Sequence, residues 1–250
     1  MKIFIDAGHG GRDPGAVGNG MRESDITLDV SLRLDAILRG AGVETNMSRR
    51  EDAAVNIDER WRTANTWGAD YFISIHVNAG GGTGAETLYF RPDSEEFART
   101  VQDVYSDEMG LRNRRIWRRE DVGVIRWSNC PTVLIELAFI DSPAANPDIN
   151  ILRNKRQEMA VAVASGLFEY LELSANPEIP PVGGRFNTLD QLPAWARPTI
   201  EMLVERGFLK GDGEGLDLSA DMVRMFVVND RAGVYQDSGG RVQVSGGVAS

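Results

Sequence analysis

Two histidines and two glutamates in this chain stand where they could bind a metal ion and transfer protons. His9 lies in a Gly-His-Gly-Gly turn after an apolar stretch, and His76 ends another apolar stretch. The chain has only these two histidines, so each can be weighed individually. Glu136 lies inside the apolar run 133–139. Burying an ionised carboxylate costs several kcal/mol unless it is paired or bound to a metal, so a strand that carries one usually uses it.

This pattern predicts a catalytic zinc site. Such a site takes three nitrogen or oxygen ligands from the protein and leaves a fourth position for water. His9 and His76 supply two ligands, and Glu23, at the end of a glycine-containing loop after His9, is the natural third. Glu136 then stays unligated and acts as the general base that takes a proton from the attacking water.

Each of these residues also has an ordinary structural interpretation. A glycine-rich turn such as the one around His9 is more often only a turn, and a single histidine is more often packed in a core. Glu23 could simply favour a helix N-terminus through the helix macrodipole. Glu136 is the hardest to explain in this way. Four such residues at strand ends that can meet favour the metal site.

The elements that must position these residues follow from apolar periodicity over residues 1–173. Helices are predicted from Ser24 to Gly40 and over 56–67, 94–109 and 153–173. Strands are predicted over 2–6, 43–48, 71–76, 86–90, 122–126 and 132–140. Strands that alternate with helices predict an α/β fold, a three-layer sandwich with a mostly parallel central sheet flanked by helices. Ligand sites in such sheets lie at the carboxyl ends of strands.

Composition limits the remaining possibilities. With 42% hydrophobic and 26% charged residues, the chain has the composition of a soluble globular protein, and no run reaches the ~18 apolar residues of a membrane helix. The net charge of −10 disfavours nucleic acid as a partner. Cys130, the single cysteine, excludes an internal disulfide framework and a cysteine-built zinc site. No secretory signal precedes the first strand, so we expect synthesis in the cytoplasm without a signal peptide.

A proline- and glycine-rich stretch divides the chain. We expect a catalytic domain over 1–174, a Pro/Gly linker over 175–184, and a small, mainly helical C-terminal domain over 185–250. The last of these has predicted helices over 194–206 and 219–228.

Several of these segments resemble the zinc-dependent N-acetylmuramoyl-L-alanine amidases of bacterial autolysins and phage endolysins. The matching segments occur in the family's order, with Glu23 between the first and second of them. They are IDAGHGG with DPGA (5–16), SR (48–49), SIHVNA (74–79) and VLIELAFI (133–140).

The resemblance implies one zinc held by His9, Glu23 and His76, with Glu136 as the catalytic carboxylate. It implies peptidoglycan as the substrate, cut at the amide between the lactyl group of N-acetylmuramic acid and L-alanine. It also implies action on the bacterial cell wall. We expect a phage lysin that reaches the wall after phage-mediated release, and the alternative is a bacterial autolysin exported by another route. The alternatives are another zinc hydrolase of cell-wall peptides, or a catalytically inactive wall-binding protein.

Two further regions have open interpretations. A basic cluster surrounds Trp117. It is either a solvated face, which we favour, or a groove wall that holds anionic wall polymers or stem-peptide carboxylates, with Trp117 and Trp127 stacking on sugars. Its members are Arg112, Arg114, Arg115, Arg118 and Arg119. The C-terminal domain resembles the S-layer-homology type of repeat in a short segment from Trp195 to Gly211. We expect this domain either to bind the cell wall or to serve as an oligomerisation or packing unit.

Overall fold

The computed structural model describes residues 1–143, 145–172, 185–192, 196–210, 215–219, 222–223 and 226. The chain divides into two compact units, Met1–Asn176 and Pro177–Ser250. The linker predicted over 175–184 lies outside the described residues. The domain limits predicted from the sequence therefore stay a proposal, and each unit is described by itself.

The first unit is built on a six-stranded sheet. Its strands lie in the order β4-β1-β5-β8-β6-β7, and only the β6–β8 pair is antiparallel. The strands are β1 (Lys2–Ala7), β4 (Glu44–Met47), β5 (Tyr71–Asn78), β6 (Ala85–Tyr89), β7 (Asn113–Arg118) and β8 (Thr132–Phe139). A small hairpin of β2 (Val17–Gly18) and β3 (Met21–Arg22) lies outside the sheet. The predicted mostly parallel sheet is confirmed.

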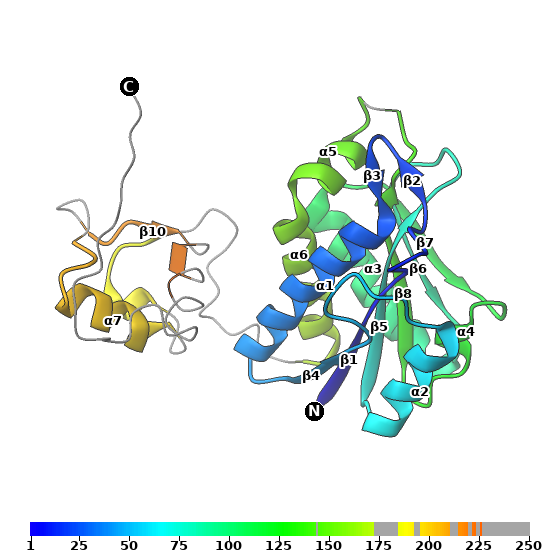
Figure 1. Cartoon of the computed structure of the whole chain (residues 1–250), viewed down its shortest axis with the longest axis horizontal. Helices are drawn as coiled ribbons and strands as arrows, with labels where there is room; N and C mark the ends of the chain where they lie inside the picture. The colour runs from blue at the N-terminus through cyan, green and yellow to red at the C-terminus, as the bar shows by residue number, and fades with distance from the viewer. Residues whose placement is uncertain are drawn as a thin grey trace. The chain divides into compact units, whose positions relative to one another are not determined.

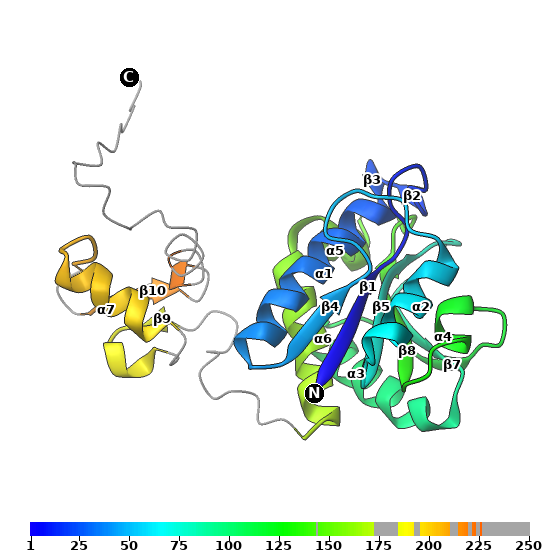
Figure 2. The ribbon, with the colours of Figure 1, turned by 60° about the horizontal axis from the view of Figure 1, so that its bottom comes forward.

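Helices cover both faces of this sheet (Figures 1 and 2). Three of them, α1, α3 and α6, pack together on one face, while α2 and α4 pack on the other. Their bounds are α1 (Glu23–Gly40), α2 (Ile57–Trp67), α3 (Glu95–Met109), α4 (Gly123–Arg126), α5 (Pro147–Asn154) and α6 (Arg156–Tyr170), with a 3-10 turn η1 (Pro92–Ser94) before α3. The predicted three-layer sandwich is therefore confirmed.

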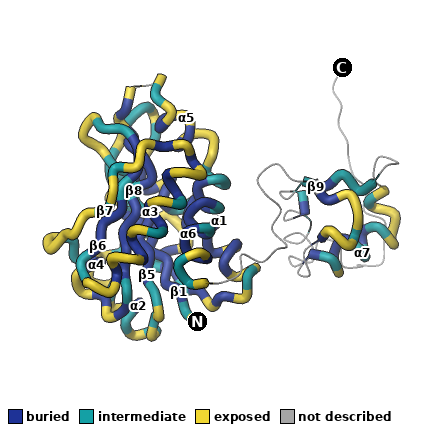
Figure 3. Tube along the Cα trace, turned by 180° about the vertical axis from the view of Figure 1, so that it is seen from behind, coloured by how far each residue is buried: buried dark blue, intermediate teal, exposed yellow. Residues whose placement is uncertain are grey.

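The alternation of side chains along each strand decides which face the site occupies. Phe4, Phe72 and Leu134 point to the α2–α4 face, where they form one apolar cluster with side chains of both helices. Two residues further along the same strands come Asp6, Ser74 and Glu136, which share that face because strands have a period of two. Both faces are covered, so the central strands are buried (Figure 3) and appear in the sequence as continuous apolar runs.

One predicted strand is wrong. Residues 123–126 of this segment form the short helix α4, and the strand next to β6 at this edge of the sheet is β7, which lies within the arginine-rich segment. The apolar residues Val124 and Ile125 are buried because they pack against the sheet from a helix. Strand β7 is mostly exposed at the edge, so it lacks the apolar pattern that reveals a buried strand.

Two predicted helices have different bounds in the structure. The helix predicted from Ser24 begins at Glu23, with Arg22 as its N-cap residue. The helix predicted over 153–173 is two helices, α5 and α6, separated at Lys155. The first difference matters for function, because it makes Glu23 the first residue of α1, directly after the loop that begins at His9.

A buried ion pair fixes the end of β1 to α2. The guanidinium of Arg60 donates to the Asp6 carboxylate at 2.7 Å, and Ser74 donates to the other Asp6 oxygen at 2.6 Å. Burial alone would raise the pKa of Asp6, but the charge of Arg60 and these hydrogen bonds lower it. Arg60 also donates to the carbonyl oxygens of Ala7 and His9, at 2.7 and 2.8 Å. The pair therefore holds the chain segment that carries His9.

The second unit has its own apolar cluster in the described residues. Strand β9 (Arg185–Phe186) pairs antiparallel with β10 (Leu218–Ser219), and a 3-10 turn η2 (Leu189–Gln191) precedes α7 (Arg197–Glu205). The buried residues are Phe186, Leu192, Ala196, Ile200, Leu203, Leu218 and Val223. Helix α7 lies where a helix over 194–206 was predicted. The helix predicted over 219–228 falls mostly outside the described residues. None of the helices in the described parts of the chain is long and apolar enough to cross a membrane.

Two arginines of α2 give a matched test of the buried pair. We expect Arg60→Met to lower the free energy of unfolding by about 3–5 kcal/mol, because it leaves the Asp6 carboxylate buried without its partner. Arg62→Met removes an exposed pair with Asp58 from the same helix, and should cost less than about 1 kcal/mol. Urea denaturation of both variants measures the difference. Equal losses would contradict the structural role given to Arg60.

Candidate functional site

The sheet topology brings the four predicted residues to one end of the sheet. His9 follows β1 directly beyond Gly8, His76 lies near the end of β5, and Glu136 lies in β8. The register of β5 and β8 places His76 opposite Glu136. Glu23 reaches them from the first turn of α1. Residues 9, 23, 76 and 136, which are far apart in the sequence, are thus neighbours in the fold.

One oxygen of Glu23 lies between the two histidines. Its Oε1 atom is 3.2 Å from His9 Nε2 and 3.0 Å from His76 Nδ1. The two imidazole rings have their centroids 4.9 Å apart at 76°. Backbone N–H groups hold the carboxylate: Val77 donates to Oε1 at 2.9 Å, and Ala16 donates to Oε2 at 2.8 Å. The three side chains therefore form one compact group around a common point.

Opposite charges decide the protonation states in this group. Burial disfavours the ionised form of Glu23, but hydrogen bonds with His76 and His9 lower its pKa far below the usual range. Burial would also lower the pKa of His9, yet its hydrogen bond to Glu23 and the nearby Asp13 raise it to about 9. Without a metal, His9 therefore carries a proton at neutral pH, and metal binding must displace it.

The position of His9 is fixed by its neighbours. It has a left-handed backbone with φ +58°, a conformation that costs a non-glycine residue about 1–3 kcal/mol. Asp13 Oδ2 lies 2.8 Å from His9 Nδ1, which leaves Nε2 to face Glu23. Partners of this kind fix the tautomer and orientation of metal-binding histidines. Arg60 holds the His9 carbonyl, and Arg49 donates to the Gly8 carbonyl at 2.9 Å.

Glycine is required at the closest approach of the two histidine segments. A Cβ atom on Gly8 would lie 2.5 Å from the imidazole of His76. At Gly15, where φ is +64°, a Cβ atom would lie 2.5 Å from a carboxylate oxygen of Glu23. Distances this short do not occur for real Cβ atoms, so a larger residue at either position would displace the site. The glycines around His9 thus make room for the cluster.

Glu136 lies beside this group without joining it. Its Oε2 atom is buried and has no hydrogen-bond partner among the described residues. Burial raises the pKa of Glu136 to about 7, with His76 lowering it and the carboxylates of Glu23 and Glu86 raising it. A buried carboxylate oxygen without a partner is rare in native proteins and needs an explanation, and a catalytic role is one such explanation. A carboxyl group with a pKa near neutrality can both accept and release a proton.

Sequence reasoning missed a second row of polar contacts beyond Glu136. Glu86 in β6 is paired with Glu136 in the sheet register. Its carboxylate accepts from Asn78 at 2.7 Å and from Arg114 of β7 at 2.9 Å. The Arg114 guanidinium also lies over the Phe139 ring, 4.7 Å from its centroid. The sequence feature that could have revealed this row is Glu86, a charged residue near the start of a mostly apolar strand that follows a glycine-rich loop.

The donor set fits a divalent metal ion. Two imidazole nitrogens and one carboxylate oxygen are the ligands of many catalytic zinc sites. In a tetrahedral zinc site with bonds of about 2.0–2.1 Å, neighbouring ligand atoms lie roughly 3.3 Å apart. The distances of 3.0 and 3.2 Å from Glu23 Oε1 to the two histidines are close to this value. Three protein ligands leave a fourth position for water or substrate.

Most of the basic cluster around Trp117 is neutralised. Arg118 pairs with Glu120 at 2.8 Å and Arg119 with Asp121 at 2.7 Å, both on the surface. These two arginines fit the solvated face that the sequence favoured. Trp117 and Trp127 are 52% and 54% exposed, so both rings are accessible to a ligand.

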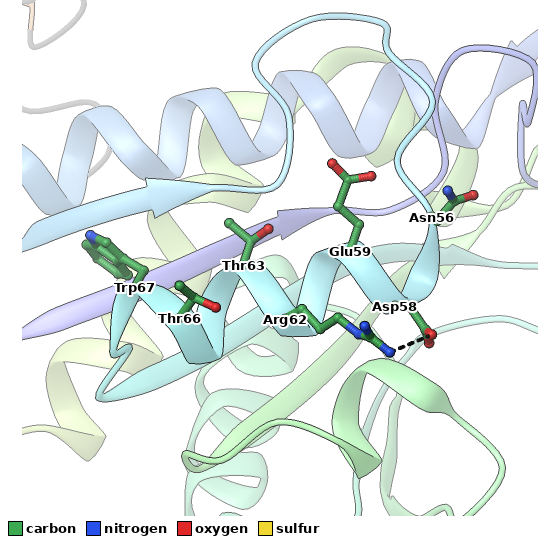
Figure 4. Close-up of a pocket in the computed structure, with 7 residues that line it drawn as sticks. All are labelled: Asn56, Asp58, Glu59, Arg62, Thr63, Thr66 and Trp67. Atoms are coloured by element: carbon green, nitrogen blue, oxygen red, sulfur yellow. Dashed lines mark hydrogen bonds and ion pairs between the residues drawn. The ribbon is translucent and has the colours of Figure 1, made fainter.

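A hollow of about 660 Å³ lies along α2 and is a separate feature (Figure 4). It is wide open to solvent, and the residues that line it include the exposed pair of Arg62 and Asp58. Binding sites for small molecules usually bury most of their ligand. Since this hollow contains none of the four clustered residues, we place the chemistry at the end of the sheet.

The fold and the cluster define the class of protein: an α/β domain that carries a His-Glu-His group suited to a metal ion, next to a buried carboxyl group. The family model described as N-acetylmuramoyl-L-alanine amidase matches residues 3–169. The chain belongs to this family, and peptidoglycan is the substrate that the family implies. The resemblance and the enzyme class predicted from the sequence are confirmed.

Named relatives agree with this assignment. A sporulation-specific N-acetylmuramoyl-L-alanine amidase of Bacillus subtilis is 41% identical over 180 residues, which are 69% of each protein. The endolysin of Bacillus phage SPP1 is 33% identical over 68% of this chain and 66% of its own length. The solved catalytic domain of the amidase CwlV from Bacillus (Paenibacillus) polymyxa superposes with a TM-score of 0.65 at 30% identity, over 69% of this chain and 99% of that domain.

The raised pKa of Glu136 has a consequence for stability. The folded protein holds this proton up to about pH 7, whereas an ordinary glutamate releases it near 4.5. Stability from this group is therefore lost as the pH rises from about 4.5 to 7. In chelator-treated protein, we expect Glu136→Gln to increase the free energy of unfolding by about 1–3 kcal/mol at pH 8, and by much less at pH 5.

Urea denaturation at the two pH values measures this difference. The wild-type chain at each pH is the control, because every other titrating group is common to both proteins. A Glu136→Gln variant that is less stable than wild type at pH 8 would contradict the account, because it would show that burial does not destabilise the ionised Glu136 carboxylate.

Proposed function

We propose that this enzyme is a zinc amidase in which His9, Glu23 and His76 hold the metal ion and Glu136 is the catalytic acid and base. The bond cut is the amide between the lactyl group of N-acetylmuramic acid and L-alanine in peptidoglycan. The observation that carries the proposal is the unpartnered oxygen of Glu136, which lies in the strand next to a His-Glu-His group with ligand spacing.

The metal ion and the residues that hold it have separate tasks. When bound, zinc supplies Lewis acidity, which polarises a carbonyl group and makes water acidic enough to attack near neutral pH. Asp13 and Arg60 hold His9 in place, and the N–H groups of Val77 and Ala16 orient Glu23. Ligands held in this way lose little freedom when the metal binds, so the geometry is set before substrate arrives.

Glu136 performs both proton transfers in this proposal. It first takes a proton from the attacking water, and then donates it to the nitrogen of the leaving L-alanine. The second transfer is needed because an amide nitrogen leaves readily only when it is protonated. A pKa of about 7 suits a group that must first accept a proton and then give it away. Its position in a buried strand keeps the carboxyl group fixed between the two transfers.

We also propose where the enzyme acts. It is made in the cytoplasm and reaches the cell wall after phage-mediated release. The similarity to the endolysin of phage SPP1 supports this order of events. Expression in a bacterial host tests it: lysis should require a membrane-permeabilising protein, and lysis without one would contradict the proposal.

Variants of the four residues test the proposed roles. We expect His9→Ala and His76→Ala to lose both bound zinc and activity, because each removes one of three ligands. Glu136→Ala should keep zinc and lose about 10²–10⁴-fold in rate, the usual contribution of a general acid or base. Zinc per chain is measured by elemental mass spectrometry, and the rate by the turbidity of purified cell walls.

Mass analysis of the digested walls provides the control on the reaction itself. The wild-type enzyme should release free lactyl ends of muramic acid and new N-terminal L-alanine. Different ends would indicate another zinc hydrolase of wall peptides, and zinc binding without turnover would indicate an inactive wall-binding protein. Full zinc content in both histidine variants would refute the ligand set.

The second unit has two alternative roles, binding of the cell wall or formation of a homo-oligomer. Its separate apolar cluster supports either role. The test compares the full chain with residues 1–176 by sedimentation with purified walls and by size-exclusion chromatography. Wall binding predicts that only the full chain sediments with walls, and oligomer formation predicts that only the full chain elutes as a multimer. Identical behaviour of the two proteins in both assays would contradict both roles.

A further inference from the structure

The edge strand β7 has an irregular backbone at the level of Glu136. In its pairing with β6, Ala85 is opposite Asn113 and Thr87 is opposite Ile116. Two residues of β7, Arg114 and Arg115, therefore face the single residue Glu86. Arg115 adopts φ +75°, the left-handed region that favours glycine. Bulges of this kind occur at sheet edges and next to active sites, where they redirect a side chain.

The bulge is held by the exposed side chain of Asn113, which the buried Gln102 contacts in turn. Asn113 Oδ1 accepts from the Arg115 N–H at 2.8 Å and from the Gln102 side chain at 3.1 Å. Gln102 is fully buried and also donates to the carbonyl of Ala85 at 2.8 Å. A strained conformation persists only where its surroundings impose it, and such positions cluster at functional sites. The structure thus imposes an unusual position on Arg115.

Two arginines of this edge keep their charge available. Arg114 is paired with Glu86, and the two arginines after Trp117 are paired with their own neighbours. Arg112 and Arg115 are exposed, and no acidic side chain in the described part of the chain pairs with either. The Arg112 carbonyl accepts from the N–H of Ala85, the first residue of β6. Arg112 therefore lies next to the residue that precedes Glu86. Free positive charge at this place, in a chain of net charge −10, favours an anionic ligand.

The sheet order gives the site a direction. The strands lie in the order β1, β5, β8, β6 and β7 (Figure 1). In their register, His76 is opposite Glu136, Glu136 is opposite Glu86, and Glu86 faces the bulge of Arg114 and Arg115. In the proposed function, on which this inference rests, the scissile carbonyl lies at the His-Glu-His group and the leaving nitrogen lies at Glu136. The peptide attached to that nitrogen therefore continues over β6 toward β7.

The distance along this direction matches a short peptide. Strand β7 lies two strands beyond β8, or about 10 Å at the usual spacing of about 4.8 Å between strands. An extended peptide covers about 3.3–3.6 Å per residue. A carboxylate on the second or third residue of the stem peptide would therefore reach the two free arginines.

We propose that Arg112 and Arg115 form a subsite for carboxylate groups of the stem peptide, on the side of Glu136 away from the His-Glu-His group. The subsite makes the enzyme prefer peptides with free carboxylates at the second and third residues over peptides in which these groups are amides. A charged hydrogen bond to a carboxylate is stronger than one to a neutral amide, which is the physical basis of the preference.

Two synthetic substrates and three proteins test this proposal. The substrates are a muramyl tripeptide with free carboxylates on its second and third residues, and the same molecule with both groups as carboxamides. The proteins are the wild type, the double variant Arg112→Gln with Arg115→Gln, and the control Arg99→Gln. Arg99 is an exposed arginine of α3, where it pairs with Glu95 of the same helix. Helix α3 packs on the face of the sheet opposite to the face of Glu136. The measured quantity is the ratio of kcat/KM for the two substrates.

We expect wild type and Arg99→Gln to prefer the free carboxylates by about tenfold, and the double variant to show a ratio near one. A ratio does not depend on how much of the variant is folded, so partial misfolding does not imitate this result. An unchanged ratio in the double variant, or no preference in wild type, would overturn the proposal. It would also be overturned if the double variant failed only on walls that carry anionic polymers. Failure of wild type to hydrolyse either substrate would instead contradict the proposed function.

Discussion

The structure depends on one carboxylate oxygen shared by two imidazole rings. Glu23 Oε1 lies within 3.2 Å of a nitrogen of each histidine, of which His9 follows β1 and His76 lies in β5. Three features of the surroundings keep Glu23 and the two histidines together. Helix α1 begins at Glu23, Gly8 leaves room for the His76 ring, and Arg60 donates to the His9 carbonyl. Such a concentration of buried polar groups is stable only when each is paired, which the ion pairs and backbone N–H groups provide.

The sheet gives Glu136 different neighbours on its two sides. Parallel strands end together, so His76 and Glu136 lie side by side in β5 and β8. The antiparallel strand β6 then begins at the same end, and places Glu86 beside Glu136. Glu136 is thus flanked by the His-Glu-His group on one side and by a carboxylate neutralised by Arg114 on the other. This asymmetry gives the two sides of a substrate amide different surroundings.

The sequence was sufficient to predict the central strands and to select four residues that the fold brings together, but not to predict the features that support them. Strands β1, β5 and β8 are buried on both faces, so their apolar runs are unmistakable, and Glu136 is conspicuous in such a run. Strand β7 was missed because an exposed edge strand need not be apolar. The role of Arg60 was missed because its partner Asp6 lies 54 positions away, and a buried arginine looks like any surface arginine in a sequence. Contacts of this kind depend on the packing of α2 against the sheet, which local patterns do not reveal.

X-ray absorption at the zinc edge of the zinc-loaded protein tests the central claim most directly, because it reports the atoms bound to the metal ion. The account predicts two imidazole nitrogens at about 2.0–2.1 Å, with the remaining ligands oxygen atoms at about 2.0–2.2 Å. In the Glu23→Ala variant, the imidazole contribution should weaken as zinc is lost. A sulfur ligand at about 2.3 Å, or a spectrum with no imidazole, would contradict it.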